Sequence, residues 1–123
     1  MPKAAWLAAI FILTATPSFA DGYIRGNDLY PLCSTTPENV PGDQQANAST
    51  QWGFCRGYIA GVADILENRE VAGYRACIAA PTVEIGQLAE VVTNFLRDHP
   101  DERQLTAASN VAFALSKAFP CKR

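Results

Sequence analysis

Apolar residues recur every three or four positions in three long stretches of the chain, a spacing typical of amphipathic helices. The first predicted helix runs from Ser49 or Thr50 to about Glu67. The second covers 82–98, with Thr82 as its N-cap, and the third covers 106–119. No stretch of useful length alternates apolar and polar residues with a period of two, so the pattern predicts an all-α fold.

Each of the three helices carries a stripe of apolar side chains that we expect to face a common core. The expected inward residues are Phe54, Tyr58, Val62 and Ile65 in the first helix, Ile85, Leu88, Val91, Val92, Phe95 and Leu96 in the second, and Ala108, Val111, Ala112, Leu115 and Phe119 in the third.

A second face of the first helix is built from small residues, namely Gly57, Ala60 and Gly61, followed by Asp64. Each glycine inside a helix costs up to about 1 kcal/mol relative to alanine. We therefore expect another helix to approach closely there. Asp64 is then either a buried hydrogen-bond acceptor or an exposed residue on the flank of the helix.

The remaining segments are predicted to be connections. A short helix over 27–33 is limited by Pro31, and the polar segment 34–50 is predicted to be a loop. The segment 67–81 connects the first two long helices and turns at Gly73. Prolines end the two later helices, because a residue that precedes proline leaves the helical region; these prolines are Pro100, after His99, and Pro120, after Phe119.

The first twenty residues have the pattern of a cleavable signal peptide. Lys3 gives a basic start, 4–14 is apolar, and small residues precede a cut after Ala20. The apolar run is shorter than the ~20 residues that a membrane-spanning helix needs, although an uncleaved anchor is the competing interpretation. We expect 21–123 to be a single helical domain in the periplasm, with no membrane span in the mature chain.

Four cysteines, an even number in an exported chain, predict two disulfides. Two pairings are considered: Cys55–Cys77 with Cys33–Cys121, and Cys33–Cys55 with Cys77–Cys121. We favour the first, because a connection of about ten residues is long enough to run back along the first helix. The expected fold is thus a disulfide-stapled bundle of three main helices plus a short N-terminal one.

Charge and composition argue against several functions. Without Lys3 the chain has nine basic and twelve acidic residues, a formal charge of −3, and its basic residues are scattered rather than clustered as in nucleic-acid binders. The lone histidine, His99, lies in a turn, and the carboxylates near it are expected to be solvated. We predict no catalytic site, no metal site and no cofactor.

Three segments carry a family resemblance: CRGYIAGVAD at 55–64, CIAAPTVEIGQLAEVVTNFLRDHPDER at 77–103 and SNVAFALSKAFPC at 109–121. In this order and spacing they resemble the Rap/Tai family, immunity proteins of type VI secretion amidase effectors. The residues that match its motifs are Gly57, Tyr58, Ile59, Gly61, Asp64, Gln87, Leu88, His99, Pro100, Phe119 and Pro120.

The resemblance implies a periplasmic all-α protein, often a homodimer, that binds a peptidoglycan amidase and occludes its active site. We expect the exposed loops 67–76 and 98–104 to be presented to such a partner. Two other classes stay open: a periplasmic stress or chaperone-like protein, and an accessory subunit of an envelope complex.

Overall fold

The computed structural model describes residues 22–79 and 82–122, and the fold of this part of the chain is all-α, as predicted. It contains no β-strand within these residues, only isolated bridges. The elements in chain order are α1 (Gly26–Ser34), η1 (Pro37–Asn39), η2 (Gly42–Gln44), α2 (Gln45–Leu66), α3 (Ile85–Asp98), η3 (Glu102–Gln104) and α4 (Ala107–Ala118), where η marks a short 3-10 helix.

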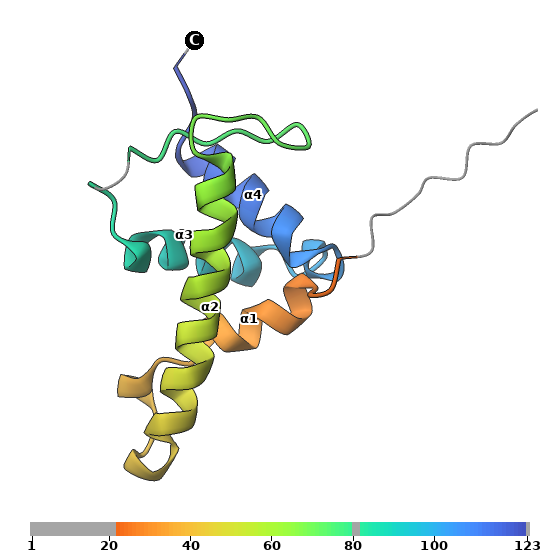
Figure 1. Ribbon diagram of the computed structural model, residues 1–123. Helices are drawn as coiled ribbons and strands as arrows, with labels where there is room; N and C mark the ends of the chain where they lie inside the picture. The colour runs from red at the N-terminus through yellow and green to blue at the C-terminus, as the bar shows by residue number, and fades with distance from the viewer. Residues whose placement is uncertain (1–21, 80–81, 123) are drawn as a thin grey trace, which may run out of the picture.

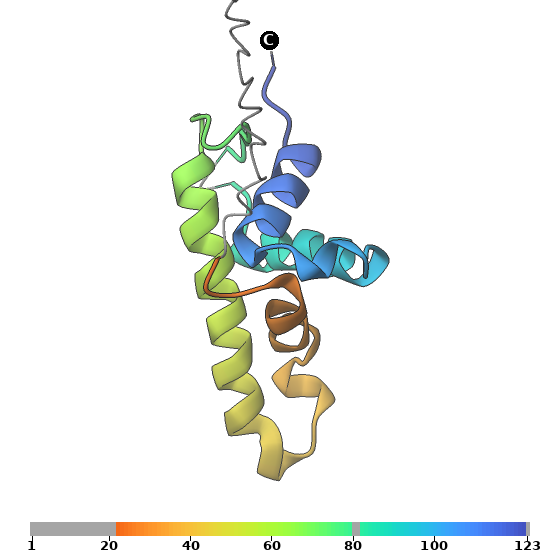
Figure 2. The ribbon, with the colours of Figure 1, turned by 90° about the vertical axis from the view of Figure 1, so that its right-hand side faces the viewer.

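The longest helix, α2, runs the full height of the molecule, and the other helices pack against it (Figures 1 and 2). The helices α1, α3 and α4 also contact one another. The short helices η1 and η2 lie beside the N-terminal part of α2, whereas the connection that follows α2 lies at the other end, near the C-terminus. Among the described residues, nothing packs on the face of α2 that carries Gly57 and Gly61.

One core joins all four helices. Its fully buried members include Leu29 of α1, Ile59 of α2, Leu96 of α3 and Leu115 of α4. The predicted stripe of α3 is confirmed, because all six of its residues are buried or half-buried; they are Ile85, Leu88, Val91, Val92, Phe95 and Leu96.

The face that α2 turns inward differs from the prediction. Phe54 and Ile65 were expected in the core, but they are 47% and 54% exposed. The buried residues of this helix are instead Ala48, Cys55, Ile59, Ala63 and Leu66. Tyr58 and Val62 of the predicted stripe are half-buried and pack against the core, so the prediction is wrong at Phe54 and Ile65. Both faces of α2 are poor in charge, and the period alone selected the stripe with the larger side chains.

The expectation of a helix packed on the glycine face is also wrong within the described chain. A Cβ atom added to Gly57 or Gly61 would meet no atom within 4 Å. Asp64 is exposed, which is the second of the two alternatives considered for it. The glycine face of α2 therefore has no partner from the described residues.

Two element boundaries differ from the prediction because of local hydrogen bonds. The segment 45–50 is helix rather than loop, since η2 leads directly into α2. Helix α3 begins three residues after Thr82. The Thr82 hydroxyl donates to the carbonyl of Ala79 at 2.6 Å, and Gln87 Oε1 accepts from the backbone N–H of Glu84, the residue that caps the helix, at 2.8 Å.

The first and last helices were predicted more closely. Helix α1 passes through Pro31 and ends at Ser34, so the proline does not limit it. Helix α4 begins after Thr106, whose side chain accepts from the backbone N–H of Ser109 at 3.2 Å, and it ends before Phe119. Ala108 is exposed rather than inward.

The disulfides are Cys33–Cys55 and Cys77–Cys121, so the favoured pairing is wrong and the second pairing is present. The connection after α2 does not run back along the helix. The backbone N–H of Ala76 donates to the carbonyl of Leu66, at the very end of α2, and that of Cys77 donates to Phe119. Cys55 lies eleven residues before Leu66, about 16 Å away along a helix, and is out of reach of Cys77.

No helix in the described ranges is long and apolar enough to cross a membrane. The predicted signal peptide and its cut after Ala20 lie outside the described residues.

Candidate binding surface

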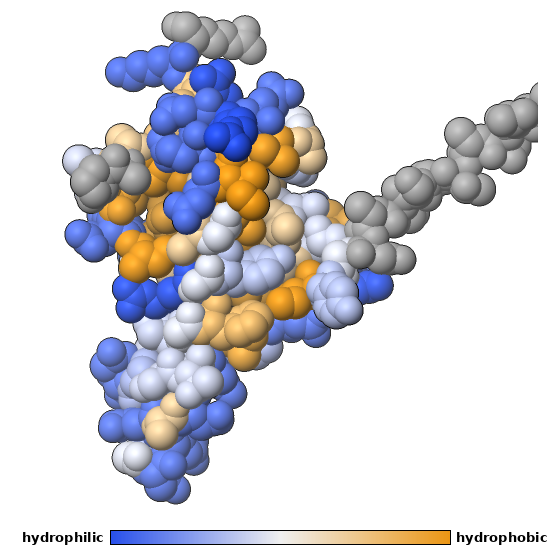
Figure 3. Space-filling view, in the orientation of Figure 1, coloured by the Kyte–Doolittle hydropathy of each residue, from blue (hydrophilic) through white to orange (hydrophobic). Residues whose placement is uncertain are grey.

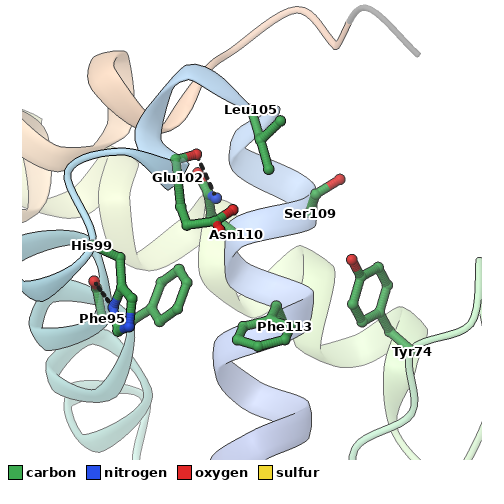
Figure 4. A pocket seen from close by; sticks show the side chains of 8 residues that line it. All are labelled: Tyr74, Phe95, His99, Glu102, Leu105, Ser109, Asn110 and Phe113. Atoms are coloured by element: carbon green, nitrogen blue, oxygen red, sulfur yellow. Dashed lines mark hydrogen bonds between the residues drawn. The ribbon is translucent and has the colours of Figure 1, made fainter. Parts of the chain in front are cut away.

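A groove with aromatic walls runs between α3 and α4 (Figure 4). Phe95 lies at its centre, and its ring stacks on the ring of His99 with centroids 4.4 Å apart. Phe113 of α4 tilts against the same ring at 5.4 Å. Tyr74, from the connection after α2, lines the side of the groove beyond Phe113. The run of chain from α3 to α4 and the connection after α2, which are distant in sequence, thus contribute to one hollow.

His99 is fixed in this groove by the end of α3. Its Nδ1 lies 2.9 Å from the carbonyl oxygen of Phe95, one helical turn earlier. A carbonyl oxygen only accepts hydrogen bonds, so Nδ1 carries a proton and donates it. The other ring nitrogen, Nε2, then carries the proton-accepting lone pair in the neutral imidazole. His99 is therefore an oriented polar and aromatic surface group.

Asn110 forms the buried end of the groove and is only 2% exposed. Its Nδ2 donates to the carbonyl of Glu102 at 3.0 Å, which fixes η3 against α4. Its Oδ1 has no hydrogen-bond partner in the described part of the chain and lies close to Gly26. Asn110 thus joins α4 to η3 and to the start of α1, and it holds Glu102 at the edge of the groove.

A second, mostly apolar hollow adjoins the groove and shares Tyr74 and Ser109 with it. It lies between the end of α2, the connection 67–79 and α4. The residues that line it are Val62, Ile65, Leu66, Val71, Ala72, Tyr74, Ala108, Ser109 and Ala112. We call the groove and this hollow together the binding surface.

The binding surface exposes large apolar side chains. Ile65, Val71, Leu105 and Phe113 are each between 37% and 54% exposed. On the face shown in Figure 3, where α2 lies in front, apolar residues gather on the upper half of the molecule, whereas the lower end around η1 and η2 is hydrophilic; the groove of Figure 4 is viewed from another side. Contiguous exposed apolar surface on a soluble protein marks sites that contact other molecules.

The comparison with protein families agrees with a binding role. A family model for Rap1a immunity proteins matches residues 25–121. The chain belongs to this family. Comparison with curated proteins gives no match. This match confirms the family resemblance that the sequence motifs indicated. Membership in the Rap1a family suggests an immunity protein that acts against a secreted effector.

The Rap1a family also suggests a non-enzymatic inhibitor. All four cysteines are paired in disulfides, as in an exported protein, and no thiol is free to act as a nucleophile. Among residues 22–79 and 82–122, no group of three or more His, Cys, Asp or Glu side chains is placed to hold a metal ion.

The acidic side chains near the helix ends have structural or surface positions. The carboxylate of Glu67 accepts from the side chain of Asn68 at 2.8 Å and from the backbone N–H of Ile78 at 3.0 Å, so it holds the connection after α2 in place. Asp98 forms an exposed ion pair with Arg97 at 3.0 Å.

Four of the eleven motif residues that indicated the family support the architecture rather than the binding surface. Ile59 and Leu88 lie in the core, Gln87 caps α3, and the carbonyl of Phe119 accepts from Cys77. The other exposed motif residues outside the groove are Gly57, Gly61, Asp64, Pro100 and Pro120, and Tyr58 is half-buried on α2. His99 is the one motif residue that lines the groove.

Sequence reasoning missed most of the binding surface. Phe95 was assigned to the core stripe of α3, and Leu105 and Asn110 were not singled out. Phe113 offered a signal, because it lies outside the inward stripe of α4 and is a large apolar residue on an outward face. Tyr74 packs against the core and also lines both hollows.

Proposed function

We propose that this chain is a periplasmic immunity protein that binds a peptidoglycan amidase delivered by a neighbouring cell through type VI secretion and covers its active site. Rap1a family membership and the pair of disulfides support this proposal. The surface that we assign to the amidase is the binding surface, with the loops 67–76 and 98–104 at its edges.

The observation that carries the proposal is the placement of these two loops. Val71 and Tyr74 of the first loop line the apolar hollow, and His99 of the second lines the groove. Helix α4 lies between them, so both loops border one apolar surface. A partner that docks on α4 would contact both loops at once, which suits the occlusion of a cleft.

The first loop is held in shape before any partner arrives. Val71 and Tyr74 exchange backbone hydrogen bonds of 2.8 and 2.9 Å, and the N–H of Asn68 donates to the carbonyl of Ala76 at 3.0 Å. The disulfide Cys77–Cys121 ties the end of this loop to the chain that follows α4. A loop that is already ordered loses little conformational freedom on binding, and this favours tight association.

The test uses a cysteine–histidine amidase encoded next to the gene for this chain. The purified proteins are mixed at increasing ratios, and release of peptide from peptidoglycan is measured. We expect inhibition to be complete near equal molar amounts. A Phe113→Glu variant should lose inhibition, because it places a charge in the apolar groove, while Gly42→Ala, remote from the surface, should inhibit normally. The proposal is wrong if no amidase is encoded nearby and the protein inhibits none that are tested.

Export is tested separately. We propose that the first twenty residues direct the chain to the periplasm and are removed. Sequencing the N-terminus of protein released by osmotic shock should begin at Asp21. Recovery of the whole protein with the membrane fraction, starting at Met1, would contradict cleavage.

We also propose a homodimer, as the family resemblance implies, formed by the outward face of α2. This face exposes Phe54 beside the uncovered Gly57 and Gly61. The only charged residues of α2 are Arg56 and Asp64. In an antiparallel pair that crosses near Ala60, Arg56 of one copy would approach the partner's Asp64. Sedimentation equilibrium should give a dimer for the wild type and a monomer for Gly57→Glu; a monomeric wild type would overturn this interface.

A further inference from the structure

The groove between α3 and α4 carries opposite charges at its two ends. Glu102 lines the end near Asn110, and Lys117 lines the other end, where its Nζ lies 5.4 Å from the centroid of the Phe113 ring. Asn110 and Lys117 are seven residues apart on α4, or about 10 Å along the helix. The two ends share Phe95, His99 and Phe113, so the groove is continuous.

The carboxylate of Glu102 forms no ion pair within the described part of the chain. The nearby basic residues are engaged elsewhere. The guanidinium of Arg103 lies 4.0 Å from the centroid of the Tyr30 ring and donates to the carbonyls of Leu96 and Arg97, while Arg97 pairs with Asp98. The backbone carbonyl of Glu102, by contrast, is held by Asn110. Glu102 is thus an unpaired negative charge on a fixed backbone.

The rings beside Glu102 add to its attraction for a cation. The faces of aromatic rings carry partial negative charge, and a Lys or Arg side chain placed over them is stabilised by about 0.5–2 kcal/mol. The chain's own Lys117 already lies near the ring of Phe113 in this way. At the Glu102 end, Phe95, Phe113 and Tyr74 present their rings with no cation of the chain among the lining residues.

The size of this end of the groove fits one side chain. The cavity there has a volume of about 170 Å³. Pockets for small-molecule ligands and cofactors typically measure ~300–1,000 Å³, so this cavity suits a single side chain better than a whole ligand.

We propose that the Glu102 end of the groove binds an arginine or lysine side chain that projects from the effector, with its charge at the Glu102 carboxylate and its apolar stem against Phe95 and Phe113. This inference rests on the proposed function and names the chemistry that the effector brings to the same surface. Lys117, at the opposite end of the groove, repels positive charge. The basic side chain of the effector is therefore directed to the Glu102 end and not to the Lys117 end.

The test needs no effector. N-acetyl-arginine amide is added to the isotopically labelled protein, and the resonances of His99 and Phe113 are followed by nuclear magnetic resonance. N-acetyl-citrulline amide, which has the same length but no charge, is the matched probe. We expect the arginine probe to shift both residues with an affinity at least about fivefold higher than that of the citrulline probe. Equal shifts from both probes would overturn the proposal.

Two variants test whether the Glu102 carboxylate is the group that attracts the arginine probe. Glu102→Gln should lower the affinity for the arginine probe about fivefold, whereas Asp101→Asn, which removes a neighbouring exposed charge that does not line the groove, should leave it unchanged. An equal loss in both variants would indicate general attraction to an acidic surface and would overturn the assignment to Glu102.

A comparison with the amidase separates this inference from the proposed function. Glu102→Gln should weaken amidase binding and reduce its dependence on salt, while Asp43→Asn, which removes an exposed charge in η2 outside both loops, should do neither. If the amidase binds the wild type and Glu102→Gln equally, the inference fails and the immunity function stands. If no amidase binds but the arginine probe still discriminates through Glu102, the immunity function fails and the groove's preference for a cation stands.

Discussion

Gly26 begins α1 at a point where three segments meet. Its backbone N–H donates to the carbonyl of Leu105 at 3.0 Å, and the side chain of Asn110 and the backbone of Arg103 pack against its Cα. A Cβ atom at this position would lie 2.2 Å from Asn110 Oδ1 and 2.8 Å from Arg103 Cα. No side chain fits there without movement of the backbone.

We therefore expect Gly26→Ala to lower the free energy of unfolding by about 1–3 kcal/mol, the usual cost of overpacking. Guanidinium unfolding followed by circular dichroism measures it. Gly42→Ala is the matched control, since its Cβ would meet no atom within 4 Å. A Gly26→Ala protein as stable as this control would contradict the close packing at the start of α1.

Tyr58 gives a prediction for alkaline pH. Partial burial raises the pKa of its hydroxyl above the ordinary value of 10.0, and interaction with the backbone of Ala108 offsets part of this rise. The folded state therefore favours the neutral phenol. This contribution to stability is complete below pH 10.0 and is lost as the pH rises through the higher folded-state pKa. In a titration followed by tyrosinate absorbance, Tyr58→Phe should remove a late component; loss of an early component would contradict the predicted direction.

At the scale of elements, α2 is notable for glycines on a face that its own chain leaves open. Gly57 and Gly61 raise the entropy of the unfolded chain and pack against nothing in the described monomer. In dilute solution we expect Gly57→Ala and Gly61→Ala each to raise the free energy of unfolding by about 0.5–1 kcal/mol. Thermal unfolding of the two variants against the wild type measures this.

The same substitutions report on the proposed dimer when the protein is concentrated. If two copies of α2 approach closely at Gly57 and Gly61, an added methyl group holds them apart, and the dimer should dissociate more readily. Variants that are stabilised in dilute solution and also dimerise as well as the wild type would argue against this face as the interface.

At the scale of the whole molecule, each disulfide joins two elements that the chain order separates. Cys33–Cys55 ties the end of α1 to the middle of α2 across 22 residues, and Cys77–Cys121 ties the connection after α2 to the segment after α4 across 44 residues. Closing loops of this length restricts the unfolded chain and stabilises the fold by about 3–4 kcal/mol per bridge.

Peptide mapping tests the pairing directly. Trypsin cleaves after Arg25 and Arg56, so Cys33 and Cys55 fall in one peptide, 26–56. Without reduction, we expect this peptide as a single species that is lighter by two hydrogens than its reduced form. The peptide 76–97 should be joined to 118–122 through Cys77 and Cys121. A species that links 26–56 to 76–97 would contradict the pairing.

Much of the local structure was predictable from the sequence, since short-range chemistry decides it. The Thr106 cap of α4 depends on residues three positions apart, and the ends of α3 and α4 depend on Pro100 and Pro120. The starts of α2 at Gln45 and of α3 at Ile85 were not predicted, because η2 leads directly into α2 and the hydrogen bond between Glu84 and Gln87 caps α3 after Thr82.

The sequence by itself determined that this protein is an α-helical chain of the Rap1a family with paired cysteines, because helical period, caps and motif order are written in neighbouring residues. Only the tertiary structure decided which face of α2 is buried, which cysteines pair, and that Tyr74, His99 and Phe113 share one surface. The physical reason is that periodicity shows which side chains share a helix face, whereas the packing of whole helices selects the inward face and the route of each connection.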